Sequence, residues 1–160
     1  MNAKTGNLIT LATLVLISYL FPFNQSASGQ SPNSNCKQVK GNSIEVFSGG
    51  LITTGTITNG GILNGTTEFV YNPAFVFTRN PAVGSYIAEL TITTIHGQLK
   101  TSNVYLYNFG TGQFTILARI RSDASTGSFA GATGLLYFNG KTVGSAFPSE
   151  ITGEICFANE

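Results

Sequence analysis

The chain has 160 residues, of which only 9% are charged, with 8 Lys and Arg against 7 Asp and Glu. If Lys4 is removed with a leader segment, the charges balance, which excludes an electrostatic basis for binding nucleic acid or an anionic membrane. A hydrophobic content of 42% excludes intrinsic disorder, and the length is that of a single domain.

Residues 1–29 have the order of a secretory signal peptide. Lys4 precedes an apolar run over Leu8–Phe21, and small polar residues follow it as far as Gly29. A transmembrane anchor is the alternative, but the run is shorter than the roughly 20 apolar residues that cross a bilayer. We expect cleavage between Ala27 and Gln30, no stable membrane insertion afterwards, and a secreted protein in the extracellular space or periplasm.

After the leader, residues 30–41 are rich in Ser, Asn and Lys and indicate a flexible lead-in, and 42–160 form the folded domain. Its apolar residues recur with period two, as where Ile44 and Val46 alternate with Glu45. Pairs of glycine with Asn or a second Gly recur between the alternating runs and predict tight turns. These turns are at Gly49-Gly50, Asn59-Gly60, Asn64-Gly65, Gly97-Gln98, Gly110-Thr111-Gly112, Asp123–Gly127 and Asn139-Gly140.

This pattern predicts an all-β fold of seven to nine short antiparallel strands. An antiparallel β-barrel is favoured over a sandwich of the immunoglobulin type. The chain has no Trp, and its two Cys are not spaced to bridge two sheets in the middle of a domain.

The stretch over Tyr86–Arg121 allows a register to be assigned. If Gly97-Gln98 is a two-residue turn and Gly110–Gly112 closes the next hairpin, Leu106 pairs with Glu89 on one side and with Ile116 on the other. Both faces of this unit are then largely apolar, so we expect its outer face to be covered. The cover is either the Thr142–Ser149 loop or an identical subunit.

Glu89 is the main candidate site residue. In this register its carboxylate shares a face with Val104 and Leu106, where a charge is costly unless it is paired or protonated. Such a group orients a ligand or acts as a general acid or base, with Asn108 and Thr91 on the same side as further ligand-binding candidates. Alternatively the register is shifted, and Glu89 faces water beside a surface Arg.

Cys36 and Cys156 lie near the two ends of the exported chain. In an oxidising compartment such a pair forms a disulfide, closing a loop of about 120 residues. Zinc is the alternative, but two Cys with the single His96 supply too few ligands, and neither Cys has the context of a catalytic thiol. We expect no metal and no cofactor.

The segment Ser125–Gly134 reads STGSFAGATG and leads into an apolar strand at Leu135. It resembles a G-x-G-x-F-x-G-A-x-G stretch of the barrel superfamily that includes allene oxide cyclases and dirigent proteins, and the later Gly153-Glu154-Ile155 fits the same layout. The resemblance covers about ten residues. It implies an eight-stranded antiparallel barrel with an apolar cavity, often assembled as a trimer, and it transfers no catalytic residue. A phosphate-binding loop is the weaker interpretation, because no P-loop Lys follows.

Three functions follow from these observations. The first is an exported β-barrel that binds a small apolar ligand in its interior without turnover. The second is a cyclase-like or dirigent-like enzyme with Glu89 and Asn108 as polar anchors. The third is a structural or interaction protein of the cell exterior whose barrel is filled by side chains. Frequent Gly, Ala and Thr at inward positions indicate free space inside the barrel and favour the first two.

Overall fold

The computed structural model describes residues 35–158 except 75 and 78. The expected signal peptide at 1–29 lies outside these residues. The first strand begins at Asn35, so 35–41 are part of the sheet instead of a flexible lead-in. Among the described residues, no helix is long and apolar enough to span a membrane.

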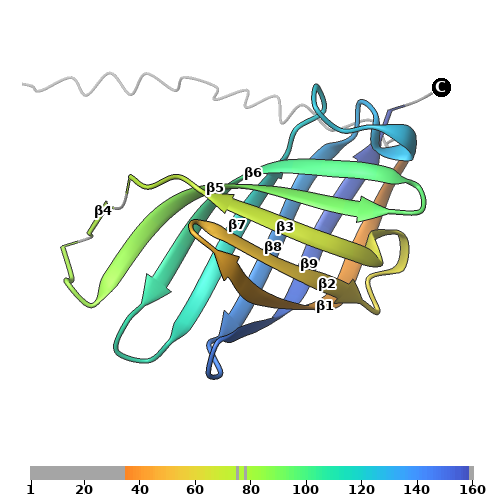
Figure 1. Cartoon of the computed structure of the whole chain (residues 1–160). Coiled ribbons are helices and arrows are strands. Elements are labelled where there is room, and N and C mark those ends of the chain that lie inside the picture. The colour runs from red at the N-terminus through yellow and green to blue at the C-terminus, as the bar shows by residue number, and fades with distance from the viewer. Residues whose placement is uncertain (1–34, 75, 78, 159–160) are drawn as a thin grey trace, which may run out of the picture. The chain divides into compact units, whose positions relative to one another are not determined.

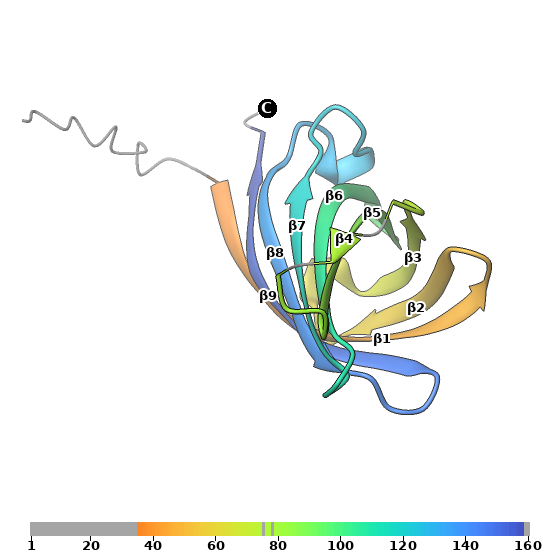
Figure 2. The same cartoon turned by 90° about the vertical axis from the view of Figure 1, so that its left-hand side faces the viewer.

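The fold is a closed antiparallel barrel of eight strands, which confirms the predicted fold class (Figures 1 and 2). Each strand pairs with its neighbours in sequence, and the ring closes where β1 pairs with β9; the short β4 lies outside the ring, paired with β5. The strands are β1 (Asn35–Gly49), β2 (Ile52–Thr58), β3 (Gly65–Tyr71), β4 (Val76–Phe77), β5 (Val83–Thr94), β6 (Gly97–Asn108), β7 (Gln113–Ile120), β8 (Thr133–Lys141) and β9 (Ala146–Phe157).

Alternate residues of every strand point into the barrel and form one core. Large inward side chains such as Phe69, Phe138 and Leu136 are completely buried. They occupy the barrel interior together with small inward residues such as Ala88 and Ala118.

The register expected for β5, β6 and β7 is wrong. The β5–β6 turn consists of Ile95 and His96, because Gly97 is already paired with Thr94 as the first residue of β6. Gly97 has a φ of 131°, and a Cβ there would lie 2.3 Å from a backbone oxygen, so this glycine is needed for a close approach. The β6–β7 pairing is shifted as well, since Ile116 lies opposite Tyr105.

Asn139-Gly140 is not a turn, because both residues lie within β8. Gly140 points into the barrel, where a Cβ would lie 2.2 Å from the Pro148 carbonyl oxygen and 2.5 Å from the ring of Phe114. The glycine is therefore explained by packing, a role that the sequence does not distinguish from a turn.

One end of the barrel is closed by two short 3-10 segments, η1 (Gly61–Leu63) and η2 (Gly127–Phe129). The side chains of Leu63 and Phe129 are fully buried there. Phe129 is the aromatic residue of the glycine-rich segment, so this segment acts as a plug and as the connection between β7 and β8. We call this the closed end; it also carries Asn35 and Phe157, the outer residues of the β1–β9 pair.

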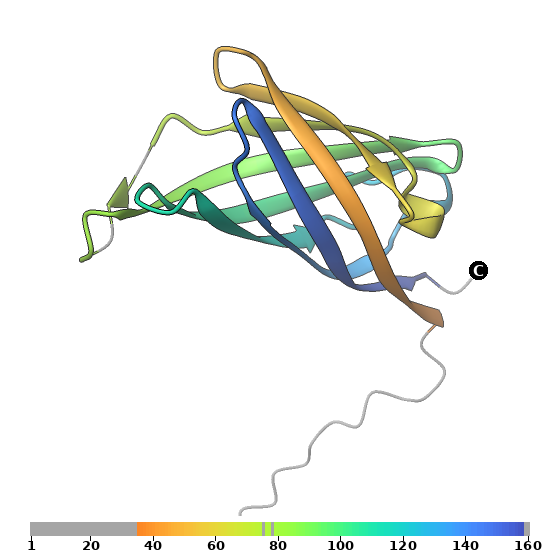
Figure 3. The same ribbon diagram turned by 90° about the horizontal axis from the view of Figure 1, so that it is seen from below.

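The predicted disulfide is present. Cys36 of β1 lies directly opposite Cys156 of β9, and their sulfur atoms are 2.07 Å apart. Figure 3 shows β9 in dark blue alongside β1 in orange, the two strands that the bond joins. The bridge fastens the first strand to the last at the seam where the barrel closes.

Candidate functional site

The opposite end, which we call the open end, carries the β1–β2, β3–β5, β6–β7 and β8–β9 connections. It contains a pocket of about 520 Å³, within the usual range for small-molecule sites. The lining is mostly aromatic: Phe47, Tyr71, Tyr86, Tyr105, Tyr107, Phe109 and Phe147, with Gly50, Leu51, Asn72 and Pro73.

Three tyrosines from three strands form the wall of this pocket. The ring centres of Tyr71, Tyr86 and Tyr105 are 5.8 to 6.2 Å apart, and each pair is edge-to-face, with interplanar angles of 69° to 89°. Edge-to-face packing is the favoured geometry for aromatic pairs. Burial raises the pKa of all three, so the phenols stay neutral at physiological pH.

Glu45 lies directly beneath the aromatic wall. It points inward from β1, two residues before Phe47, and is only 5% exposed. Thr67 of β3 donates a hydrogen bond of 2.5 Å to its Oε1, whereas Oε2 has no partner among the described residues. Burial raises the pKa of Glu45 to about 7, although the Thr67 hydrogen bond acts in the opposite direction. Near neutral pH this carboxyl therefore exists in both protonation states.

Gly55 makes this position of the carboxyl possible. Glu45, Gly55 and Thr67 lie side by side across β1, β2 and β3. A Cβ at Gly55 would lie 2.7 Å from both Cδ and Oε2 of Glu45, so only glycine lets the side chain cross β2 to reach Thr67. The buried position of the Glu45 carboxyl therefore depends on the glycine at position 55.

A small space of about 10 Å³ adjoins Glu45. Tyr71, Tyr105 and Phe147 line both this space and the larger pocket above it, so the space beside the carboxyl adjoins the pocket at these three side chains. The hydroxyls of Ser43 and Ser149 form a hydrogen bond of 2.8 Å and line the same small space. We call this space, with Glu45, the floor of the pocket.

The sequence-predicted site residues are not in this pocket. Glu89 lies on the outer face of β5 with its side chain 70% exposed, and Arg121 Nη1 donates to its Oε1 at 3.1 Å. This is the alternative of a surface carboxylate beside an Arg, and the inward placement of Glu89 is wrong. Thr91 also faces outward, in an open hollow of about 600 Å³ that Thr54 and Thr93 also line.

Asn108 lies at the end of β6 and shapes the β6–β7 turn. Its Oδ1 accepts hydrogen bonds from the backbone N–H groups of Gly110 and Thr111, at 3.0 and 3.1 Å. Nothing brings Asn108, Thr91 and Glu89 into one site.

Sequence reasoning missed Glu45 because it treated Ile44 and Val46 as the apolar face of their strand. These two residues face outward, with 55% and 42% exposed. The available signal was the inward series Val39, Gly41, Ser43 and Glu45, whose small members leave space around a carboxylate.

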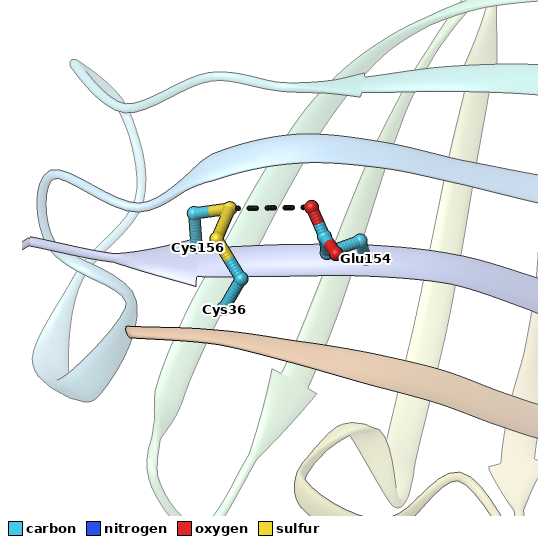
Figure 4. A group of neighbouring side chains, drawn as sticks. All are labelled: Cys36, Glu154 and Cys156. Carbon is cyan, nitrogen blue, oxygen red and sulfur yellow. Dashed lines mark hydrogen bonds between the residues drawn. A yellow bond between two sulfur atoms is a disulfide. The ribbon is translucent and has the colours of Figure 1, made fainter. Parts of the chain in front are cut away.

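One cluster of side chains of the kinds that ligate metals does not form a metal site. Cys36, Glu154 and Cys156 lie together, but the disulfide leaves no thiolate to bind a metal (Figure 4). Oε1 of Glu154 lies 3.5 Å from Sγ of Cys156, which carries no proton in the bridged form. Gln38 donates to the other oxygen of Glu154 at 2.6 Å.

The outer face of β5 to β8 is apolar, as expected, but the residues that form it include Ile87 and Val104, which the expected register placed inward. Ile87, Val104, Leu117 and Tyr137 are successive cross-strand partners, and all four are exposed. The segment Thr142–Ser149 does not cover them, because its last residues belong to β9. Coverage by an identical subunit, as a trimer or otherwise, stays a prediction.

Fold and site together define a small disulfide-closed antiparallel β-barrel with an aromatic pocket at one end and a buried carboxyl beneath it. No family model matches the chain, and no curated protein matches it either.

Proposed function

We propose that the protein is an exported barrel that binds a small, largely apolar ligand in the open-end pocket without turning it over. The observation that carries the proposal is the aromatic pocket of about 520 Å³ with the buried Glu45 beneath it. Pockets that are mainly apolar with one or two well-placed polar groups are typical small-molecule sites. The disulfide fits the oxidising compartment that export provides.

The test is a binding screen with two matched variants of one strand. Phe47 lines the pocket and Ile44 faces outward on the same strand, and both are largely exposed, at 59% and 55%. Neither truncation to Ala removes much buried surface, so both variants should fold.

The protein is purified without reducing agent, examined by native mass spectrometry for a retained adduct, and then titrated with a set of small aromatic and aliphatic compounds. We expect Phe47→Ala to weaken binding at least tenfold and Ile44→Ala to leave it unchanged. Equal effects of the two truncations, or no binding by any compound, would contradict the proposal and favour a structural protein.

Catalysis on a bound apolar substrate is the second candidate, and Glu45 specifically favours it. A carboxyl with a pKa of about 7 exchanges protons readily near neutral pH, which suits a general acid or base. In that case incubation with the bound compound yields a product of altered mass or stereochemistry, and Glu45→Gln abolishes its formation. An unchanged compound supports binding alone.

A further inference from the structure

We propose that the ligand of this pocket is an organic ammonium ion with an apolar body, held with its charged group between the tyrosine wall and Glu45. This inference rests on the proposed function and adds the chemical class of the ligand.

The first argument is the shape of the wall. Tyr71, Tyr86 and Tyr105 all line the pocket, and their ring planes meet at 69° to 89°, so the wall presents ring faces in several directions. Aromatic rings attract cations through the negative potential of their faces, and several rings around one point form the usual cage for ammonium groups. Tyr107 and Phe109, in edge-to-face contact at 5.1 Å, extend the aromatic surface toward solvent for an apolar body.

The second argument is the charge at the floor. Among the described residues that line the pocket and the space below it, Glu45 is the one acidic residue, and none is Lys, Arg or His. Its Oε2 has no hydrogen-bond donor. A buried carboxylate is stabilised by a cation, and no side chain around it supplies one, so a ligand ammonium is the matching partner.

The third argument is that two tyrosines of the wall also line the floor. Tyr71 and Tyr105 contact both spaces, so a group lodged between them lies close to the carboxyl and to the ring faces. The titratable groups that face Glu45 from other strands are the phenols of Tyr71 in β3 and Tyr105 in β6. The residues of β7, β8 and β9 that line the same space have no titratable side chain. A change of ligand affinity near neutral pH therefore reports on Glu45.

The test compares two soluble probes of similar size, phenethylammonium and the neutral 2-phenylethanol, by isothermal titration calorimetry. We expect the ammonium to bind at least tenfold more tightly than the alcohol at pH 8. Because only the ionised carboxyl pairs with it, its affinity should fall about tenfold between pH 8 and pH 6, whereas the affinity of the alcohol stays level.

Two variants locate the effect. Glu45→Gln should remove the preference for the ammonium and leave the alcohol unaffected, and Glu89→Gln, an exposed control on β5, should change neither. If Glu45→Gln does not fold, the pH dependence of the wild-type protein decides alone. Equal binding of both probes, or a preference that is independent of pH, overturns the inference.

The outcomes also separate the inference from the proposed function. If neutral compounds of the screen bind at the pocket and the ammonium does not, the ligand class is wrong and the binding function stands. If no compound binds, both are wrong.

Discussion

The pH dependence of stability offers a direct test of the buried carboxyl. The folded protein holds the pKa of Glu45 at about 7, above the ordinary value of 4.5. Between these two values the folded state binds the proton more tightly than the unfolded state. The free energy of unfolding therefore falls as the pH rises through this window, and the contribution of Glu45 is level below and above it.

The size of the effect follows from the shift. About 2.5 pKa units at 1.36 kcal/mol each amount to about 3 kcal/mol, or roughly 10 °C in melting temperature for a domain of this size. In Glu45→Gln this pH dependence disappears, because the amide does not titrate.

The assay is urea denaturation of the wild type and of Glu45→Gln at several pH values from 4 to 8. The difference between the two proteins isolates Glu45, because the surface carboxylates and His96 at the β5–β6 turn are present in both. Relative to the variant, the wild type should lose about 3 kcal/mol between the lowest and the highest pH. Parallel curves would refute the reasoning and would mean that the carboxyl is hydrated in the folded protein.

Three further predictions concern the frame of the barrel. Gly55→Ala should lower the free energy of unfolding by about 3 kcal/mol or more, because its Cβ would lie 2.1 Å from a backbone oxygen of β1. Gly110→Ala is the control, because its Cβ would meet one side-chain atom at 3.4 Å. Its stability in the same urea titration should lie within about 1 kcal/mol of wild type. Replacing Cys36 and Cys156 by Ser should cost about 4 to 5 kcal/mol for a loop of 120 residues, seen as a lower urea midpoint that reducing agent no longer changes. Phe129→Ala should cost about 3 to 5 kcal/mol in thermal unfolding because the ring is fully buried at the closed end, and a smaller loss would mean that the plug collapses around the cavity.

The fold class and the disulfide could be predicted because each depends on a local or compositional signal. Alternation with period two and the glycine-rich connections indicate hairpins, and two Cys near the ends of a chain with a predicted signal peptide indicate a bridge. The register could not be predicted in the same way. Gly97 and Gly140 resemble turn residues in sequence, but Gly97 packs closely against the β7–β8 connection and Gly140 packs closely against β9 and the ring of Phe114.

The site was missed for a related reason. In the second half of β1, Ile44 and Val46 face outward and Ser43 and Glu45 face inward, so the hydrophobic pattern there is the reverse of the usual one. The aromatic pocket draws its rings from β1, β3, β5, β6 and β9, which come together only once the register is known. By contrast, Glu89 looked unusual only under a register that the structure does not have.

The bond between Cys36 and Cys156 makes the barrel a covalent ring, since the backbone links the strands in succession and the disulfide links the last to the first. A single cut in any connection between strands therefore leaves the eight strands in one molecule. Cleavage by a protease in a connection at the open end therefore releases no fragment, and new chain ends can be introduced there once 36 and 156 are joined. A reductant removes this protection, so a barrel that is both nicked and reduced should separate into two fragments, whereas either change alone leaves the strands in one molecule.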